Sequence, residues 1–82
     1  MKTEVIEALL REAMPCHLIE VNTRDHVHYE AIVVSDTFVG MPRLKRQQSV
    51  YAVLGQYLQS GDIHALALKT WSVDEWKKEE QA

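Results

Sequence analysis

The chain has 82 residues, of which 46% are hydrophobic and 26% are charged. This length and composition predict one globular domain and exclude a disordered or low-complexity chain. Nine basic and twelve acidic residues give a net charge of −3, which excludes a protein coated with positive charge. No apolar run approaches the ~18 residues of a membrane span, and charged residues interrupt the N-terminal segment where an export signal needs an apolar core. Because there is a single cysteine, we expect a cytoplasmic domain without an internal disulfide.

A helix is predicted at the start of the chain. Thr3 is the candidate N-cap, and Pro15 ends the helix. Glu7 and Arg11 have the i, i+4 spacing of an ion pair on a helix surface. The apolar residues between these ends recur at the spacing of a helix that packs one face: Val5, Ile6, Leu9, Leu10, Ala13 and Met14.

Two strands are predicted next, joined by a tight turn. Residues 17–21 alternate, with Ile19 and Val21 on one face, and residues 27–34 are rich in β-branched and aromatic side chains. Residues 22–25, Asn-Thr-Arg-Asp, are typical of a turn, because Asn and Asp side chains hydrogen-bond to nearby backbone. This short connection predicts an antiparallel pair.

A second helix and a third strand follow. Residues 36–42 interrupt the second strand, and an apolar repeat of helical spacing runs from Leu44 to Leu58. Residues 60–62, Ser-Gly-Asp, end that helix, and residues 63–71 alternate as a third strand. A strand, a helix and another strand in succession predict a right-handed crossover, which makes the third strand parallel to the second.

A short helix is predicted at the end of the chain. Residues 72–75, Ser-Val-Asp-Glu, have the capping-box pattern and open a helix that runs through Trp76. We expect Trp71 and Trp76 to hold this helix against the sheet. The complete prediction is one α+β domain over residues 1–82, in the order helix, strand, strand, helix, strand, helix. Its three-stranded mixed sheet has the helices on one face, its core spans about residues 3–77, and residues 78–82 form a polar tail.

The sequence contains no recognisable catalytic motif. It has no nucleophile, P-loop or dinucleotide pattern, and three glycines offer little material for a phosphate-binding loop. We therefore expect a protein that is not an enzyme.

Three of the four histidines are candidate metal ligands. His26 and His28, in extended backbone, would project to one face. His64 begins the predicted third strand, and parallel pairing would bring it to the edge of the sheet where the second strand also begins. Imidazole binds iron, zinc and copper, so these residues are candidates for one site. In the alternative interpretation, His26 and His28 are solvated hairpin residues and His64 is partly buried with one hydrogen bond. Cys16 is expected to be a semi-buried apolar residue.

Three basic residues at the start of the second helix form another candidate site. Arg43, Lys45 and Arg46 lie where cations oppose the helix dipole. This placement indicates an anionic partner, either nucleic acid or an acidic protein surface. The alternative is a solvated surface whose charge Asp36 and Asp62 compensate.

Motifs along most of the chain resemble those of the BolA family. Residues 38–51 (Phe-Val-Gly-Met-Pro-Arg-Leu-Lys-Arg-Gln-Gln-Ser-Val-Tyr), residues 63–66 (Ile-His-Ala-Leu) and the pattern Ser72-x-x-Glu75-Trp76 occur in the family's order. The pair Gln47-Gln48 most resembles the acid-responsive bacterial branch. The resemblance implies the KH-like (class II) fold of the family, with the element order predicted above.

The resemblance also implies a protein partner and a cofactor. BolA-like proteins form heterodimers with monothiol glutaredoxins, in which a 2Fe–2S cluster is shared by a glutaredoxin cysteine, glutathione and the BolA-like partner. The family pattern implies that His64 is a cluster ligand and that the loop before the second strand supplies another, here His28 or His26. Imidazole in place of thiolate raises the potential of such a cluster and makes its ligation sensitive to protonation.

Two other hypotheses stay open at this point. The family also includes DNA-binding transcriptional regulators, a role that would use Arg43, Lys45 and Arg46. Residues 40–43, Gly-Met-Pro-Arg, lack the second glycine of the Gly-x-x-Gly loop with which KH domains hold nucleic-acid backbone, which argues against ordinary KH-type RNA binding. In the other hypothesis, the domain binds a protein and its histidines have no metal role. No membrane partner is expected.

Overall fold

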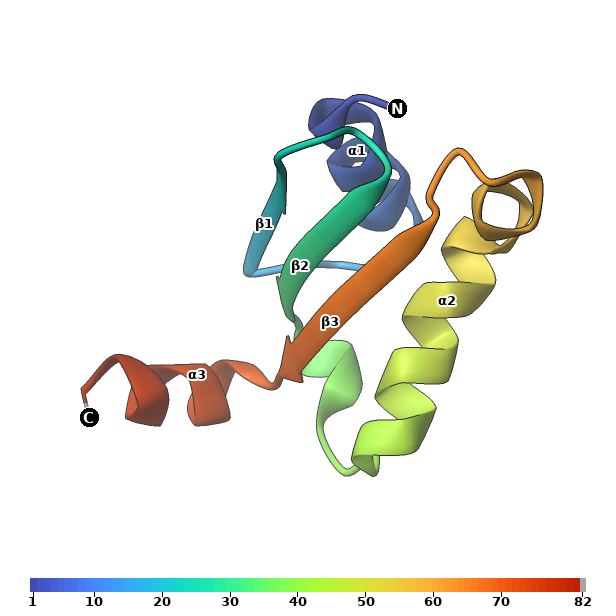
Figure 1. The fold of residues 1–82 in the computed structure, drawn as a ribbon. Helices are drawn as coiled ribbons and strands as arrows, with labels where there is room; N and C mark the ends of the chain where they lie inside the picture. Colours follow the sequence, from blue (N-terminus) through green and yellow to red (C-terminus); the bar gives the residue numbers. More distant parts are fainter. Residues whose placement is uncertain (82) are drawn as a thin grey trace.

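The computed structural model describes residues 1–81, which form a three-stranded sheet and three α-helices (Figure 1). The elements are α1 (Thr3–Ala13), β1 (Leu18–Thr23), β2 (His28–Val34), the 3₁₀ turn η1 (Asp36–Phe38), α2 (Arg43–Ser60), β3 (Ala65–Trp71) and α3 (Val73–Glu80). The strand order is β1-β2-β3, with β1 antiparallel and β3 parallel to β2. The predicted α+β class, element order and mixed sheet are confirmed. No helix within residues 1–81 is long and apolar enough to cross a membrane.

The core lies between one face of the sheet and the helices α1 and α2. Alternate residues of β2, Tyr29, Ala31 and Val33, are buried, because successive side chains of a strand point to opposite faces. The helices contribute four fully buried side chains to this layer: Ile6, Leu10, Val50 and Leu54. The opposite face of the sheet carries exposed side chains: Glu20, Asn22, Glu30, Ala67 and Lys69.

Helix α3 leaves the end of β3 and runs away from α2 (Figure 1), and none of its residues is buried. Ser72 and Glu75 form the predicted capping box, in which each side chain accepts a hydrogen bond from the backbone N–H of the other residue. The ring centroids of Trp71 and Trp76 lie 6.4 Å apart, the predicted contact between this helix and the sheet. The helix continues to Glu80, so residues 78–80 of the predicted tail are helical, and residue 82 lies outside the described residues.

The first helix and the first strand have other boundaries than those predicted. The N-cap of α1 is Lys2, without a side-chain cap, and the hydroxyl of Thr3 donates to the Glu4 carboxylate. Thr3 already belongs to the helix, so it cannot be its N-cap. Strand β1 extends to Thr23, because residues 22–23 pair with β2. The turn therefore spans residues 24–27 and lies two residues later than predicted.

The third strand begins at Ala65 rather than at residue 63. Ile63 is fully buried in the core, and its N–H donates to the Tyr57 carbonyl of α2 (3.0 Å). His64 thus lies in the loop just before β3. The alternation of residues 63–71 did not reveal this boundary, because a loop residue with a buried apolar side chain continues the alternating pattern of the strand.

Arg46 joins the start of α2 to α3. Its Nε donates to the Met41 carbonyl (2.7 Å), and its Nη1 and Nη2 donate to the Glu75 carboxylate (2.5 and 3.3 Å). The Arg46 guanidinium lowers the pKa of Glu75 to about 2. The positive charge of Arg46 is thus compensated by the carboxylate of Glu75, and not by Asp36 or Asp62 as the sequence-based alternative supposed.

Candidate functional site

Two histidines meet where β2 and β3 begin. The parallel register aligns His28 with Ala65, and the Val27 carbonyl accepts hydrogen bonds from the N–H groups of His64 (2.7 Å) and Ala65 (3.1 Å). The ring centroids of His28 and His64 lie 5.4 Å apart, with the ring planes at 79°. Both side chains are exposed. The structure therefore brings His28, the first residue of β2, to His64, as the parallel crossover predicted.

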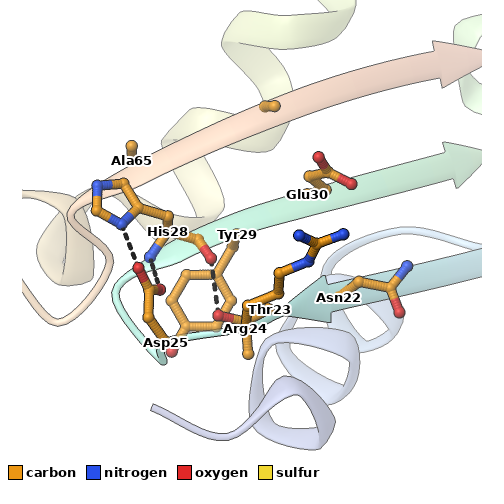
Figure 2. A pocket seen from close by; sticks show the side chains of 9 residues that line it. Asn22, Thr23, Arg24, Asp25, His28, Tyr29, Glu30 and Ala65 are labelled. Carbon is orange, nitrogen blue, oxygen red and sulfur yellow. Dashed lines mark hydrogen bonds and ion pairs between the residues drawn. The ribbon is translucent and has the colours of Figure 1, made fainter.

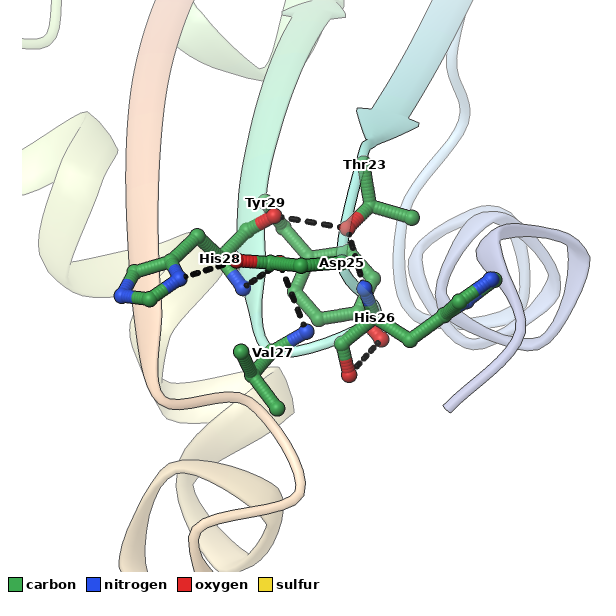
Figure 3. Close-up of polar contacts among 6 residues, drawn as sticks. All are labelled: Thr23, Asp25, His26, Val27, His28 and Tyr29. Carbon is green, nitrogen blue, oxygen red and sulfur yellow. Dashed lines mark hydrogen bonds and ion pairs between the residues drawn. The ribbon is translucent and has the colours of Figure 1, made fainter.

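His26 does not join this pair. Its φ of 61° places it in the left-handed region, and its ring points away from His28 (Figure 3). Its N–H donates to the Thr23 hydroxyl (3.0 Å), and its carbonyl accepts from the Tyr29 hydroxyl (2.9 Å). The prediction that His26 and His28 share a face is wrong, because it assumed extended backbone at a position that forms a left-handed turn.

Replacing His26 by glycine is expected to raise the free energy of unfolding by roughly 0.5–1 kcal/mol. Left-handed backbone costs a non-glycine residue about 1–2 kcal/mol, and the greater freedom of glycine in the unfolded chain returns part of this gain. Urea unfolding of His26→Gly checks the prediction, with His26→Ala as the matched control because it removes the ring and keeps the Cβ. Equal stability of the two variants would contradict it.

Asp25 organises the turn that carries His28 (Figures 2 and 3). Its Oδ1 accepts hydrogen bonds from the N–H groups of Val27 (3.1 Å) and His28 (2.8 Å), and its Oδ2 lies 2.6 Å from His28 Nδ1. The hydrogen bonds from the backbone and ring of His28 hold the pKa of Asp25 well below its usual range. The Thr23 hydroxyl also donates to the His28 carbonyl (2.7 Å).

The contact between Asp25 and the His28 ring was not predicted from the sequence, because Asp25 was interpreted only as a turn residue. The spacing Asp-x-x-His in a turn is the signal that could have revealed it. An aspartate that accepts the N–H two residues ahead forms an Asx turn, and such a turn leaves its second oxygen free for a side chain that follows closely.

A shallow concavity of about 690 Å³ lies beside this turn, on the sheet face opposite the core (Figure 2). Its lining includes Asp25, His28, Arg24 and Glu30. The side chains of His28 and Asp25 are 60% and 48% exposed. Another molecule can therefore reach the histidine pair directly.

Within residues 1–81, no group of three or more His, Cys, Asp or Glu side chains could hold a metal ion. Cys16 adds nothing to the histidine pair, because β1 begins opposite the end of β2 and Cys16 precedes β1. It is partly buried, as predicted, and this burial raises the pKa of its thiol. A metal centre on His28 and His64 would need further ligands from other molecules.

The basic residues at the start of α2 lie at the other end of the molecule from the histidine pair (Figure 1). Arg43 and Lys45 are exposed, and the first turn of α2 has no acidic residue. Arg46 differs from them, because its side chain is 12% exposed and paired with Glu75. An anionic partner would therefore meet Arg43 and Lys45 first.

Comparison with known proteins connects this chain to one family. A family model described as BolA-like protein matches residues 4–75. The acid stress protein IbaG of Escherichia coli (strain K12) is 33% identical over 79 residues, covering 96% of this chain and 93% of that protein. The DNA-binding transcriptional regulator BolA of the same strain is 36% identical over 86 residues, covering 94% of this chain and 81% of that protein.

The fold is also found among solved structures. A BolA protein homologue from Coxiella burnetii is 36% identical and superposes with a TM-score of 0.76, covering 94% of this chain and 97% of that one. This likeness covers most of the chain rather than one motif. The similarity to IbaG agrees with the acid-responsive branch that the Gln47-Gln48 pair indicated.

Proposed function

This chain belongs to the BolA-like protein family, and we propose that it is an adaptor that binds a monothiol glutaredoxin and shares a 2Fe–2S cluster with it. The observation that carries the proposal is the pair of exposed imidazoles of His28 and His64, 5.4 Å apart between ring centroids. A 2Fe–2S cluster takes four ligands besides its bridging sulfides, two of which can be histidines on one iron. A glutaredoxin cysteine and the thiol of glutathione would complete the set.

The separation of the two histidine rings suits ligation of one metal centre. With metal–nitrogen distances of about 2.0–2.1 Å, a tetrahedral centre holds the centroids of two imidazoles roughly 5–6 Å apart. The separation of 5.4 Å between the rings of His28 and His64 falls in this range. The Val27 carbonyl, which binds the N–H of His64, ties the two backbones together. Contacts within the chain itself thus bring the two rings close together.

The donor types also suit such a cluster. Imidazole in place of thiolate raises the reduction potential of a 2Fe–2S cluster. His28 and His64 would bind the cluster as neutral ligands, and protonation of either ring would weaken its binding. Because the described residues supply only these two histidines to the site, the proposal requires the cluster to be held between two proteins.

Mixing the purified chain with a monothiol glutaredoxin and glutathione, under conditions that assemble the cluster, tests the proposal. We expect a heterodimer on gel filtration, with a visible circular dichroism spectrum that differs from that of the glutaredoxin homodimer. The absence of a complex together with an unchanged spectrum would overturn the proposal. A complex whose spectrum does not depend on the cluster would favour a protein-binding module without a metal role.

DNA binding is a second candidate function, supported by the exposed pair Arg43 and Lys45 and by the similarity to a protein named as a DNA-binding regulator. Each phosphate contact makes the affinity fall with salt. If this chain binds DNA, Arg43→Ala combined with Lys45→Ala should weaken binding at low salt and flatten its salt dependence. The glutaredoxin complex should keep its spectrum, because these residues lie far from the histidines. Absence of DNA binding at low salt would remove this candidate.

A further inference from the structure

We infer that Asp25 is a positioning residue that determines which nitrogen of His28 is offered to a ligand, an inference that rests on the proposed role of His28. The two oxygens of the Asp25 carboxylate have separate tasks. Oδ1 accepts the backbone N–H groups of Val27 and His28, and Oδ2 contacts the Nδ1 atom of the His28 ring at 2.6 Å. One side chain thus shapes the turn and orients the imidazole.

The contact with Oδ2 selects one tautomer of the His28 ring. An ionised carboxylate can only accept hydrogen bonds, and a neutral imidazole carries its single proton on one nitrogen. The proton of the neutral ring must therefore lie on Nδ1. The lone pair then lies on Nε2, which Figure 3 shows on the side of the ring away from Asp25.

This arrangement matches what a metal-binding histidine needs. Histidine ligands commonly donate their second N–H to a carboxylate, which fixes the tautomer and makes the ligand more basic. Asp25 meets this requirement through a contact that lies within the chain itself. The site therefore offers His28 Nε2 as the coordinating atom, without a ring flip or a proton transfer between the two nitrogens.

The substitution Asp25→Asn separates the two tasks of the side chain. The Asn carbonyl oxygen can still accept the N–H groups of Val27 and His28, so the turn is kept. The Asn amide group replaces Oδ2 with a donor, which favours an Nδ1 lone pair and places the ring proton on Nε2. The variant should thus have a native turn and the wrong tautomer for coordination.

The first measurement uses the free protein and needs no glutaredoxin. Ring ¹⁵N chemical shifts of His28, recorded about two pH units above the ordinary histidine pKa of about 6.5, report which nitrogen carries the proton. We expect Nδ1–H in the wild type and a shift toward Nε2–H in Asp25→Asn. Asp62→Asn is the matched control, because Asp62 is an exposed loop aspartate that hydrogen-bonds to Ser60. This control should leave the tautomer of His28 unchanged.

The second measurement is the lifetime of the cluster in the complex with glutaredoxin. Loss of the carboxylate that accepts a hydrogen bond from a ligand histidine typically lowers metal affinity 10–100-fold. Asp25→Asn should therefore shorten the lifetime of the cluster by roughly ten-fold or more. Thr23→Val loosens the same turn by removing the hydroxyl that bonds to the backbone of His26 and His28. It does not touch the His28 ring, and should retain the Nδ1–H tautomer and most of the cluster lifetime.

The possible outcomes each decide the inference. An Nε2–H tautomer in the wild type, or the same tautomer in the wild type and Asp25→Asn, would overturn it. A changed tautomer with an unchanged cluster lifetime would also overturn it, because Nε2 would then not be the coordinating atom. If Thr23→Val shortens the lifetime as much as Asp25→Asn, the effect comes from the turn, and the inference is wrong. Failure of the wild type to form a complex would count against the proposed function, while the tautomer of the free protein would still show whether Asp25 orients His28.

Discussion

His64→Ala is expected to abolish the spectrum of the mixed cluster while changing the free energy of unfolding by less than about 0.5 kcal/mol, the usual limit for an exposed position without a special role. His64 is exposed, and its backbone N–H, which bonds to the Val27 carbonyl, stays in the variant. Loss of the ring removes one of the two histidine ligands from the proposed site. Some complex with the cluster-free glutaredoxin should still form.

Visible circular dichroism of the reconstituted complex and urea unfolding of the free protein check these two expectations. His17→Ala is the matched control: His17 is also exposed, but it precedes β1 at the opposite end of the sheet from His28. It should leave both measurements unchanged. If His64→Ala unfolds the protein while the remaining complex keeps its cluster spectrum, His64 has a structural role and is not a ligand.

Phe38→Ala is expected to lower the free energy of unfolding by about 3–5 kcal/mol, the typical range for truncating a buried phenylalanine. Phe38 lies in η1, is fully buried and belongs to the core cluster. The guanidinium carbon of Arg46 lies 5.9 Å from the centroid of the Phe38 ring. The substitution therefore also removes the ring beside the Arg46 side chain, which links α2 to α3. Domains of this kind are stable by only about 5–15 kcal/mol, and small ones lie at the low end.

Urea unfolding of Phe38→Ala measures this loss. Val39→Ala is the matched control, because Val39 follows directly in the chain but is 65% exposed. Its free energy of unfolding should change by less than about 0.5 kcal/mol. A loss below about 1 kcal/mol for Phe38→Ala, with an unchanged dependence on urea, would show that the core repacks around the missing ring.

The sequence predicted those features that depend on short repeats in the chain. The spacing of apolar residues in α1 and α2 and the pattern Ser72-x-x-Glu75 lie within a few turns of helix, and all three were found. The convergence of His28 and His64 followed from one topological rule, the right-handed crossover that makes β3 parallel to β2.

The features that the sequence did not predict depend on single backbone angles or on contacts between distant residues. The left-handed φ of His26 reversed the direction of its side chain, and nothing in the local composition required it at that position. The ion pair between Arg46 and Glu75 joins residues from two helices that are separated by β3. No local pattern identifies such a partner, so Arg46 was indistinguishable from Arg43 and Lys45.

The hydrogen bonds to the Val27 carbonyl, which hold the start of β3 beside His28, join residues that are far apart in the chain. Between His28 and His64 the chain forms β2, η1 and the whole of α2. Pairings between residues this far apart form late and slowly, because the intervening chain must first be ordered. A newly made or partly unfolded chain thus presents these two histidines apart from each other. In the proposed role, only a chain that has completed its fold therefore presents both cluster ligands in one place.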